Sequence, residues 1–167
     1  MGETAELVVM GIDASLRATG VGLVSLCGKR ISLVHFHVIR NPARISHGEG
    51  LSRLYASISH LIEDYSPSVA VLESAFFQRN VRTAITLGEA RGVILAACAA
   101  AGVPICEYSP REIKRALVGT GAAHKSQVGF MVKQILGLEE TPPADAADAL
   151  AAAVCHIHRL HNGRRGS

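Results

Sequence analysis

The chain has 167 residues, of which 49% are hydrophobic, and its formal net charge is +3. This length and composition predict one compact domain over residues 1–167 and exclude an intrinsically disordered protein. The longest apolar run, residues 93–106, is too short for a membrane span and is interrupted by Gly102 and Pro104, so we expect no membrane association. The N-terminus is acidic and unlike a signal sequence, which predicts a cytoplasmic protein.

The first half of the chain contains four predicted strands and one predicted helix. Apolar runs and alternation predict strands over residues 6–13, 19–26, 30–39 and 69–73. The first three strands follow one another closely and predict an antiparallel meander. Within the second strand, Gly20 and Gly22 leave the backbone open to close approach by another element. The helix is predicted over residues 46–65, because apolar side chains recur on one face, and Pro67 ends it.

The second half of the chain is mostly helical. We expect helices over residues 81–101, from Pro110 to a break at 119–121, over 125–136 and over 145–161, with a fifth strand over 103–106 and a frayed tail over 162–167. Strands that alternate with helices after a meander predict an α/β fold, with a mixed five-stranded sheet and helices on both faces. Ligand sites in such folds lie at the carboxyl ends of the strands.

Four carboxylates occupy positions where an acid is costly unless it has a partner. Asp13 and Glu73 end two apolar strands, whereas Asp145 and Asp148 lie one turn apart at the start of the last helix. Singly, each has an ordinary explanation: a turn, a strand-end charge, or the helix dipole, which favours acids in a first turn. Together, acids at neighbouring strand ends and on one helix face predict a site for a divalent cation.

Mg²⁺ suits such a site, because it prefers oxygen ligands and needs only a few carboxylates. Two Mg²⁺ ions about 3.5–4 Å apart activate a water and stabilise the leaving oxygen of a phosphodiester. We therefore predict metal-dependent phosphoryl chemistry at these four carboxylates, with Mn²⁺ as a candidate substitute for Mg²⁺.

Aromatic and basic residues follow the acids. Phe76 and Phe77 lie in a predicted loop just after Glu73, where exposed rings can stack on bases or wedge between them; packing of one ring beneath the loop is the alternative. The basic side chains that we expect to contact DNA are Arg79, Arg82, Lys114 and Lys125. A lone lysine is more often a solvated surface residue, but a lysine beside the acids can contact the scissile phosphate.

Two other motifs predict no site of their own. Residues 119–126 approach a phosphate-binding P-loop, but His124 replaces a required glycine and no strand precedes the loop, so we expect no nucleotide site. A DNA phosphate at the start of the following helix, beside Lys125 and Ser126, remains compatible with this segment. A group that resembles zinc ligands diverges around its helix: Cys155, His156, His158 and His161.

Gly88 and Gly92 lie one turn apart in the alanine-rich helix predicted over 81–101. Small residues on one stripe allow another helix or a sheet to approach closely. The stripe predicts either packing onto the sheet of the same chain or a dimer interface that sets the distance between two active sites.

Several segments of the chain resemble, in order and over nearly its whole length, the RuvC family of bacterial Holliday junction resolvases. The segments that carry this resemblance are Gly11–Asp13, Arg17–Gly22, Val71–Glu73, Phe76–Phe77, Leu87–Val93, Gly121–Val128 and Ala144–Ala151. The two runs Leu-Gly-Glu-Ala-Arg-Gly and Ala-Asp-Ala-Ala-Asp-Ala-Leu-Ala are highly specific in combination.

The resemblance implies an RNase H-like fold, a homodimer, Mg²⁺ dependence and symmetric nicking of two strands at a four-way junction. By the match, the metal-binding catalytic acids are Asp13, Glu73, Asp145 and Asp148, and Lys125 lies near the active site. The match also implies stacking by Phe76 at the crossover and, more weakly, a basic role for Lys114. A RuvA–RuvB branch-migration complex is implied as a partner by the resemblance alone.

Two departures from the family pattern leave the acids intact. Ala14-Ser15 replaces the Pro-Gly that usually follows the first aspartate, and Ser74 replaces the glutamine that commonly follows the glutamate. We expect these changes to affect the turn below the site and the sequence preference of cleavage.

Two alternatives to a resolvase are a non-cleaving module that binds branched DNA and a fragment of an actin-like kinase, which shares a glycine-rich hairpin beside a strand-end aspartate.

Overall fold

A five-stranded mixed sheet forms the centre of the protein. The computed structural model describes residues 6–74 and 80–163. In chain order the strands are β1 (Leu7–Asp13), β2 (Ala18–Cys27), β3 (Arg30–Arg40), β4 (Val69–Glu73) and β5 (Ile105–Tyr108). Their order across the sheet is β3-β2-β1-β4-β5. β1, β2 and β3 pair antiparallel, whereas β4 is parallel to β1 and β5 is parallel to β4. The predicted mixed five-stranded sheet is therefore confirmed.

This topology brings several chain segments to one end of the sheet. The parallel strands β1 and β4 both end there, at Asp13 and Glu73. Because β2 runs antiparallel to β1, and β3 antiparallel to β2, the beginning of β2 and the end of β3 lie at the same end. Asp13 and Glu73 are thereby neighbours, as the sequence predicted from the carboxyl-end rule.

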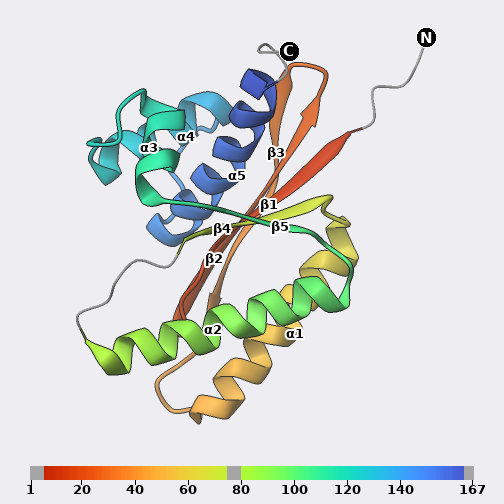
Figure 1. Ribbon diagram of the computed structural model, residues 1–167, viewed down its shortest axis with the longest axis vertical. Helices are drawn as coiled ribbons and strands as arrows, with labels where there is room; N and C mark the ends of the chain where they lie inside the picture. Colours follow the sequence, from red (N-terminus) through yellow and green to blue (C-terminus); the bar gives the residue numbers. More distant parts are fainter. Residues whose placement is uncertain (1–5, 75–79, 164–167) are drawn as a thin grey trace.

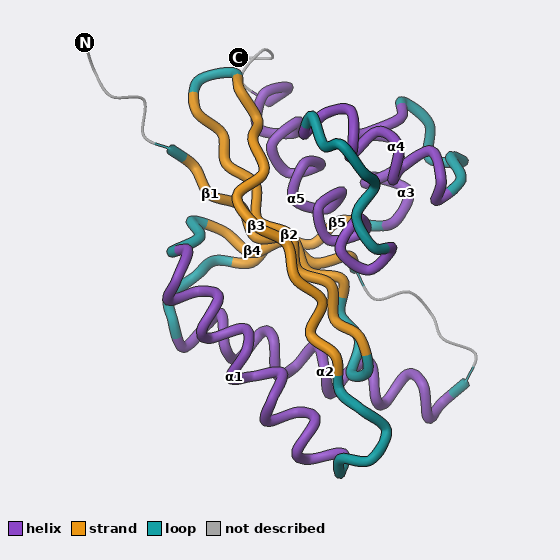
Figure 2. Tube along the Cα trace, turned by 180° about the vertical axis from the view of Figure 1, so that it is seen from behind, coloured by secondary structure: helices purple, strands orange, loops and turns teal. Residues whose placement is uncertain are grey.

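Helices cover both faces of the sheet, also as predicted. They are α1 (His47–Tyr65), α2 (Val81–Ala100), α3 (Pro110–Val118), α4 (Lys125–Leu136) and α5 (Ala144–Gly163). α1 and α2 form one layer, and α3, α4 and α5 form the other (Figure 1). The view from behind shows the same two layers on opposite sides of the strands (Figure 2). Each layer encloses its own apolar core, one around Ile58 and Ile94 and the other around Leu150 and Ile157.

Helix α5 lies unusually close to the sheet because β1 and β2 carry glycines beneath it. A Cβ atom at Gly11 would overlap the carbonyl of Ala149, and one at Gly20 would overlap the carbonyl of Asp145. At Gly22 the obstruction is Leu150. The close approach predicted for Gly20 and Gly22 is confirmed. It determines the distance between the first turns of α5 and the end of β1.

Most boundaries agree with the sequence prediction within one residue, but both ends of β5 and the end of α5 lie two residues later than predicted. β5 begins at Ile105, two residues later than expected, because Gly102 adopts a positive φ of 70° and Val103 N–H bonds back to the Cys98 carbonyl. The chain is therefore still turning where the strand was expected to start. α5 continues two residues past its predicted end at His161, so residues 162–163 belong to the helix rather than to a tail.

α2 is long and apolar enough by composition to cross a membrane, with a mean hydropathy of 1.3 over its most apolar window. In the fold it packs along α1 on one face of the sheet (Figure 1). It also carries Arg91, which is 9% exposed and lies in its centre. Only 28% of that window is buried within the described residues, so packing in the fold covers only part of the apolar surface of α2.

Candidate active site

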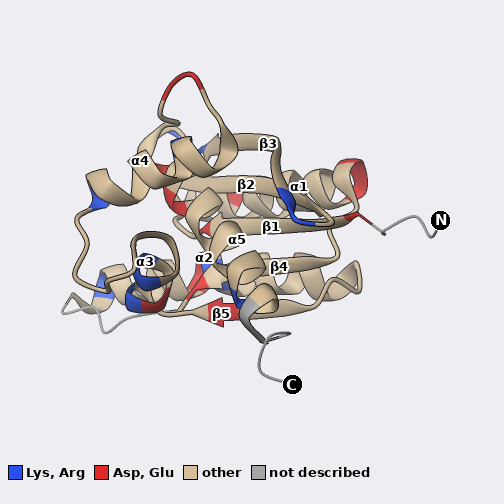
Figure 3. Cartoon of the chain, turned by 90° about the horizontal axis from the view of Figure 1, so that it is seen from above, with Lys and Arg blue, Asp and Glu red and all other residues tan. Residues whose placement is uncertain are grey.

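A small polar pocket opens where β1 and β4 end. Its volume is about 140 Å³, and α3, α4 and α5 close it from one side of the sheet. The residues that line it are Asp13, Glu73, Pro110, Ile113, Lys114, Lys125, Val128, Asp148 and Ala151. Three of the four predicted acids and two predicted lysines therefore share one pocket. Figure 3 shows acidic segments at this end of the sheet, with the basic segments of α3 beside them.

Asp13 is the most strongly perturbed acid of the pocket. Burial of its carboxyl group raises its pKa from 3.8 to about 7, and the negative charge of Asp148 adds to this rise. Glu73 and Asp145 raise the pKa further, in that order, whereas Lys125 opposes the shift. Because burial and neighbouring carboxylates together raise the pKa of Asp13 to about 7, a cation bound here would stabilise its charged form.

Glu73 reaches the same pocket from the end of β4. Although the residue is exposed at the strand end, local burial of the carboxyl group raises its pKa, and the charge of Asp148 acts in the same direction. Lys125, Lys114 and Arg91 lower it. Its main chain is anchored, because Arg91 Nη1 donates a hydrogen bond of 2.6 Å to the Glu73 carbonyl oxygen.

The two acids of α5 take different positions. Asp148 is half-buried, lines the pocket and pairs with Lys125, with 2.9 Å between Oδ2 and Nζ. Asp145 is also half-buried but does not line the pocket, and its negative charge reaches Asp13 from the side. The predicted group of four is thus brought together as three acids around the pocket and one beside it.

The lysines reach the pocket from separate helices. Lys125 begins α4, and the ion pair with Asp148 raises its pKa through the hydrogen bond and the attraction between the charges. Lys114 projects from α3, a helix that begins with Ser109 as a capping residue and Pro110 in its first turn. Sequence reasoning had no means of finding the Lys125–Asp148 contact, because 23 residues separate the two partners.

Among the predicted DNA contacts, the structure locates Arg82 outside the acidic pocket, in the first turn of α2. Phe76, Phe77 and Arg79 lie outside the described residues. Arg91 and Glu107 were not predicted as part of the site. A charged residue on the otherwise apolar stretch of α2 was the signal that could have identified Arg91, since arginine is rarely buried without a partner.

The donor set of the pocket fits a hard divalent cation. Its carboxylate oxygens are the ligands that Mg²⁺ prefers, and a cation among them would relieve the repulsion that raises the pKa of Asp13. Over residues 6–74 and 80–163, however, no three side chains of the His, Cys, Asp and Glu types lie close enough to hold a metal without moving. The residues that would draw together around a metal are Asp13, Glu73 and Asp148.

The departures from the family pattern lie at the edges of the pocket. The loop of Ala14 and Ser15 is closed by the Thr19 hydroxyl, which donates a hydrogen bond to the Ser15 carbonyl. Ser74 N–H donates to the Tyr108 carbonyl at 2.8 Å and continues the pairing of β4 with β5. Both substitutions leave the strand ends in place, so the acids keep their positions.

The cysteine and histidines of α5 join helices together. His156 Nδ1 lies 2.8 Å from the Tyr108 hydroxyl, and His158 Nδ1 donates to the Ala116 carbonyl at 2.9 Å. Cys155 Sγ contacts the Glu112 carbonyl at 3.9 Å. These contacts hold α5 against α3 and β5.

The sheet order, the helices on both faces and the carboxylates at the ends of β1 and β4 and on the last helix define an RNase H-like nuclease domain. The family model for crossover junction endodeoxyribonuclease RuvC matches residues 9–156. The chain belongs to the RuvC family.

Similar proteins agree with this assignment. A crossover junction endodeoxyribonuclease RuvC from Syntrophomonas wolfei is 44% identical over 151 residues, which cover 90% of this chain and 88% of the relative. The structure of Thermus thermophilus RuvC in complex with Holliday junction substrate superposes with a TM-score of 0.89 at 36% identity, covering 94% of this chain and 96% of that one. The yeast mitochondrial Holliday junction resolvase Ydc2 shares the fold alone, with a TM-score of 0.72 at 13% identity over 94% of this chain and 82% of that one.

Proposed function

We propose that this protein is a metal-dependent endonuclease that resolves four-way (Holliday) DNA junctions during recombination and repair by nicking two strands symmetrically. One observation carries the proposal: Asp13, Glu73 and Asp148 surround a single pocket that Lys114 and Lys125 also enter. Membership of the RuvC family and the similarity to Thermus thermophilus RuvC, whose structure contains Holliday junction substrate, support it.

The cofactor in this proposal is Mg²⁺, with two ions in each active site. When bound, these ions activate the attacking water and stabilise the leaving oxygen of the phosphodiester. Asp13, Glu73 and Asp148 hold them through their carboxylate oxygens, and Asp145 adds negative charge or a ligand from the side. Mn²⁺, which takes the same oxygen ligands, is the proposed substitute.

Lys125 has two roles in this proposal. Before substrate binds, its ammonium group neutralises Asp148 at 2.9 Å and lowers the electrostatic cost of gathering the acids. When DNA enters, the scissile phosphate attracts the same ammonium group, which is 81% exposed and therefore able to turn toward it. Lys114, which lines the same pocket from α3, is the second proposed phosphate contact. Other proposed DNA contacts are Phe76, Phe77, Arg79 and Arg82.

A homodimer is the proposed working form, because two symmetric nicks require two active sites. Gly88 and Gly92 are exposed one helical turn apart in the second half of α2. Nothing lies within 4 Å of a Cβ built at either of these glycines, so a second helix has room to approach.

We also propose a RuvA–RuvB complex as the partner of this protein and the cytoplasm as its location.

The decisive experiment is cleavage of a synthetic four-way junction by purified protein in Mg²⁺. We expect paired nicks at symmetric positions with ligatable ends, and no cleavage by Asp13→Asn or Glu73→Gln variants that still bind the junction. Binding without cleavage by the wild-type protein, in either Mg²⁺ or Mn²⁺, would instead identify a non-cleaving junction-binding module. The remaining alternative, a fragment of an actin-like kinase, predicts measurable ATP affinity, which calorimetry tests.

A further inference from the structure

A second, larger hollow lies on the α1–α2 side of the sheet, at the β1–β2 loop that follows Asp13. It has a volume of about 640 Å³ and is lined by Leu16, Arg17, His47, Val81, Arg82, Ile85, Thr86 and Glu89. A neighbouring hollow of about 450 Å³ shares Leu16, Arg82 and Thr86 with it and extends to Ala14 and Ser15. The two form one groove, called here the α2 groove, between the β1–β2 loop and the first half of α2.

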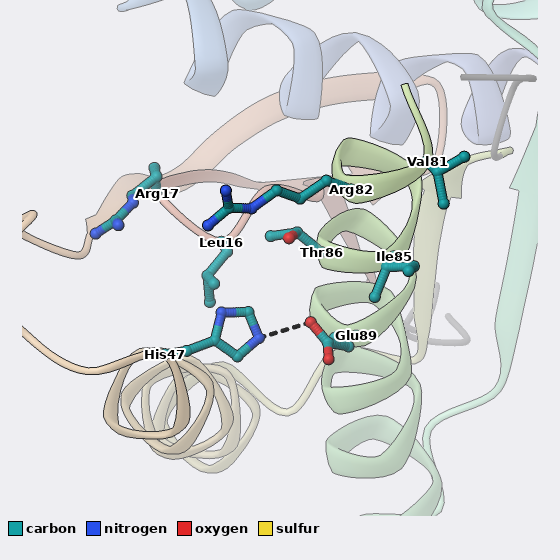
Figure 4. Close-up of a pocket in the computed structure, with 8 residues that line it drawn as sticks. All are labelled: Leu16, Arg17, His47, Val81, Arg82, Ile85, Thr86 and Glu89. Carbon is teal, nitrogen blue, oxygen red and sulfur yellow. Dashed lines mark hydrogen bonds and ion pairs between the residues drawn. The ribbon is translucent and has the colours of Figure 1, made fainter. Parts of the chain in front are cut away.

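Two arginines line the α2 groove. Figure 4 shows Arg82 extending from α2 toward Leu16, and Arg17 beyond Leu16 with its guanidinium group turned away from α2. Arg17 is held in place, because its Nη1 donates a hydrogen bond of 3.1 Å to the Pro42 carbonyl. Within residues 6–74 and 80–163, neither guanidinium group forms an ion pair with a carboxylate. Both therefore offer N–H donors to an anion.

The acid of the α2 groove is already paired. Glu89 Oε2 lies 2.6 Å from His47 Nε2, across the floor of the groove (Figure 4). This contact occupies one oxygen of Glu89, and it offsets the negative charge of Glu89 when His47 is protonated. Apolar side chains form the remaining wall, at Leu16, Val81 and Ile85. The groove thus combines two cationic groups with an apolar surface, as expected for binding of a nucleic-acid strand.

The position of the groove relates it to the active site. Asp13 ends β1, and the loop that follows it directly forms one wall of the groove. Four residues of chain span at most about 14 Å, so Arg17 lies within about four phosphate spacings of Asp13 along a DNA strand. A strand whose scissile phosphate occupies the acidic pocket can therefore continue along the groove.

We propose that the α2 groove binds the sugar–phosphate backbone of the DNA strand that leaves the active site, with Arg17 and Arg82 as its phosphate contacts. This inference rests on the proposed nuclease function and adds to it a second DNA-binding surface and Arg17. Phosphates lie against the two guanidinium groups, and sugars or bases lie against Leu16 and Ile85. An apolar protein surface fits less well, because it would bury two arginine charges without a partner.

The test measures junction binding as a function of salt concentration, in the absence of divalent metal so that no cleavage occurs. Because each protomer of the proposed homodimer contributes one copy, Arg17→Ala and Arg82→Ala should each reduce the slope of log K against log salt by about 2, and the double variant by about 4. Arg17→Lys should restore most of the lost slope. Arg30→Ala is the matched control, because Arg30 is an exposed arginine at the opposite end of the sheet, and it should leave the slope unchanged.

An unchanged slope for Arg17→Ala, equal to that of the Arg30→Ala control, overturns the inference. A change in the sedimentation of the Arg17→Ala protein without DNA, with no change in salt slope, also overturns it and identifies the groove as a contact between two copies. The proposed nuclease function fails separately, when wild-type protein with Mg²⁺ leaves four-way junctions uncut. Cleavage by wild type with an unaffected Arg17→Ala slope rejects only the groove.

Discussion

Arg91 connects α2 to the main chain of Glu73. Its Nη1 donates to the Glu73 carbonyl at 2.6 Å, and its Nη2 lies 2.7 Å from Glu107 Oε1 on β5. A single buried guanidinium group thereby joins the helix, the end of β4 and the neighbouring strand. The same helix carries Gly88 and Gly92, both exposed, at the proposed dimer contact. The proposed dimer helix and the proposed metal ligand therefore have a direct mechanical connection.

We predict that Arg91→Lys lowers the rate of junction cleavage while the protein remains folded, because a lysine cannot reproduce the two-pronged geometry of the guanidinium group. Arg91→Ala should also destabilise the fold by about 1–3 kcal/mol, the usual cost of leaving a buried polar group without its partner. Thermal unfolding and single-turnover cleavage measure the two effects. Glu107→Gln is the control: it retains an acceptor for Arg91, so a loss of activity as large as that of Arg91→Lys would contradict a role through Glu73.

Lys125→Ala should separate stability from activity. The Lys125–Asp148 pair is exposed on the lysine side, so its loss should change the free energy of unfolding by less than about 1 kcal/mol. Cleavage should fall by about 10²-fold or more, the usual effect of removing a group that stabilises charge in the transition state. Equilibrium denaturation and single-turnover kinetics test this pair of outcomes. A Lys125→Ala protein that is strongly destabilised yet cleaves at the normal rate would show that Lys125 contributes to stability and not to cleavage.

Asp13 gives the metal-free protein a specific pH dependence. Its pKa is raised from 3.8 to about 7 in the folded state, so between these values the folded protein holds a proton that the unfolded chain has released. This group therefore makes the metal-free fold progressively less stable as the pH rises from about 4 to about 7. Asp13→Asn should remove this component and, at pH 8 without metal, unfold at a higher temperature than wild type.

Metal addition should reverse the order of these two proteins. Binding requires the deprotonated carboxylate, so Mg²⁺ should stabilise wild type increasingly as the pH rises through about 7 and should stabilise Asp13→Asn much less. Thermal unfolding with and without Mg²⁺, at several pH values, measures both trends. Equal stabilisation of wild type and Asp13→Asn would argue against Asp13 as a ligand.

Gly20→Ala should displace the first turn of α5. A Cβ at this position overlaps the Asp145 carbonyl, and main-chain atoms have no side-chain rotamer through which to yield. We expect a loss of about 1–3 kcal/mol in stability, as for other overpacked positions, together with a loss of Mg²⁺ binding. Gly48→Ala on α1 is the control, because nothing lies within 4 Å of a Cβ built there. A normal metal affinity for Gly20→Ala would show that the helix position is not critical.

The sequence predicted the elements because their signals are local. Apolar runs end at Asp13 and Glu73, Pro67 follows the first helix, and Ser109 with Pro110 begins another, so each boundary could be inferred within a few residues. β5 was placed two residues too early, because its start depends on the turn after Gly102 and on pairing with β4, and neither is visible in the apolar run.

The site was less predictable than the fold, since its geometry depends on residues that are distant in sequence. The carboxyl-end rule brought Asp13 and Glu73 together correctly. The pairing of Asp148 with Lys125 and the separate position of Asp145 depend on how α4 and α5 pack, and no short motif encodes that packing. Arg17 was part of the family resemblance, but only the groove gives it a role.

The glycines of β1 and β2 have one more consequence. They place the main chain of α5 directly on the main chain of the sheet, so that backbone atoms rather than interchangeable side chains determine how far the Asp148 carboxylate lies from that of Asp13. Exchanges elsewhere in the apolar cores can alter stability while leaving this spacing untouched. Evolution of such an enzyme can vary its surfaces and its DNA preferences widely, but the distance between α5 and the strands β1 and β2 has to stay constant.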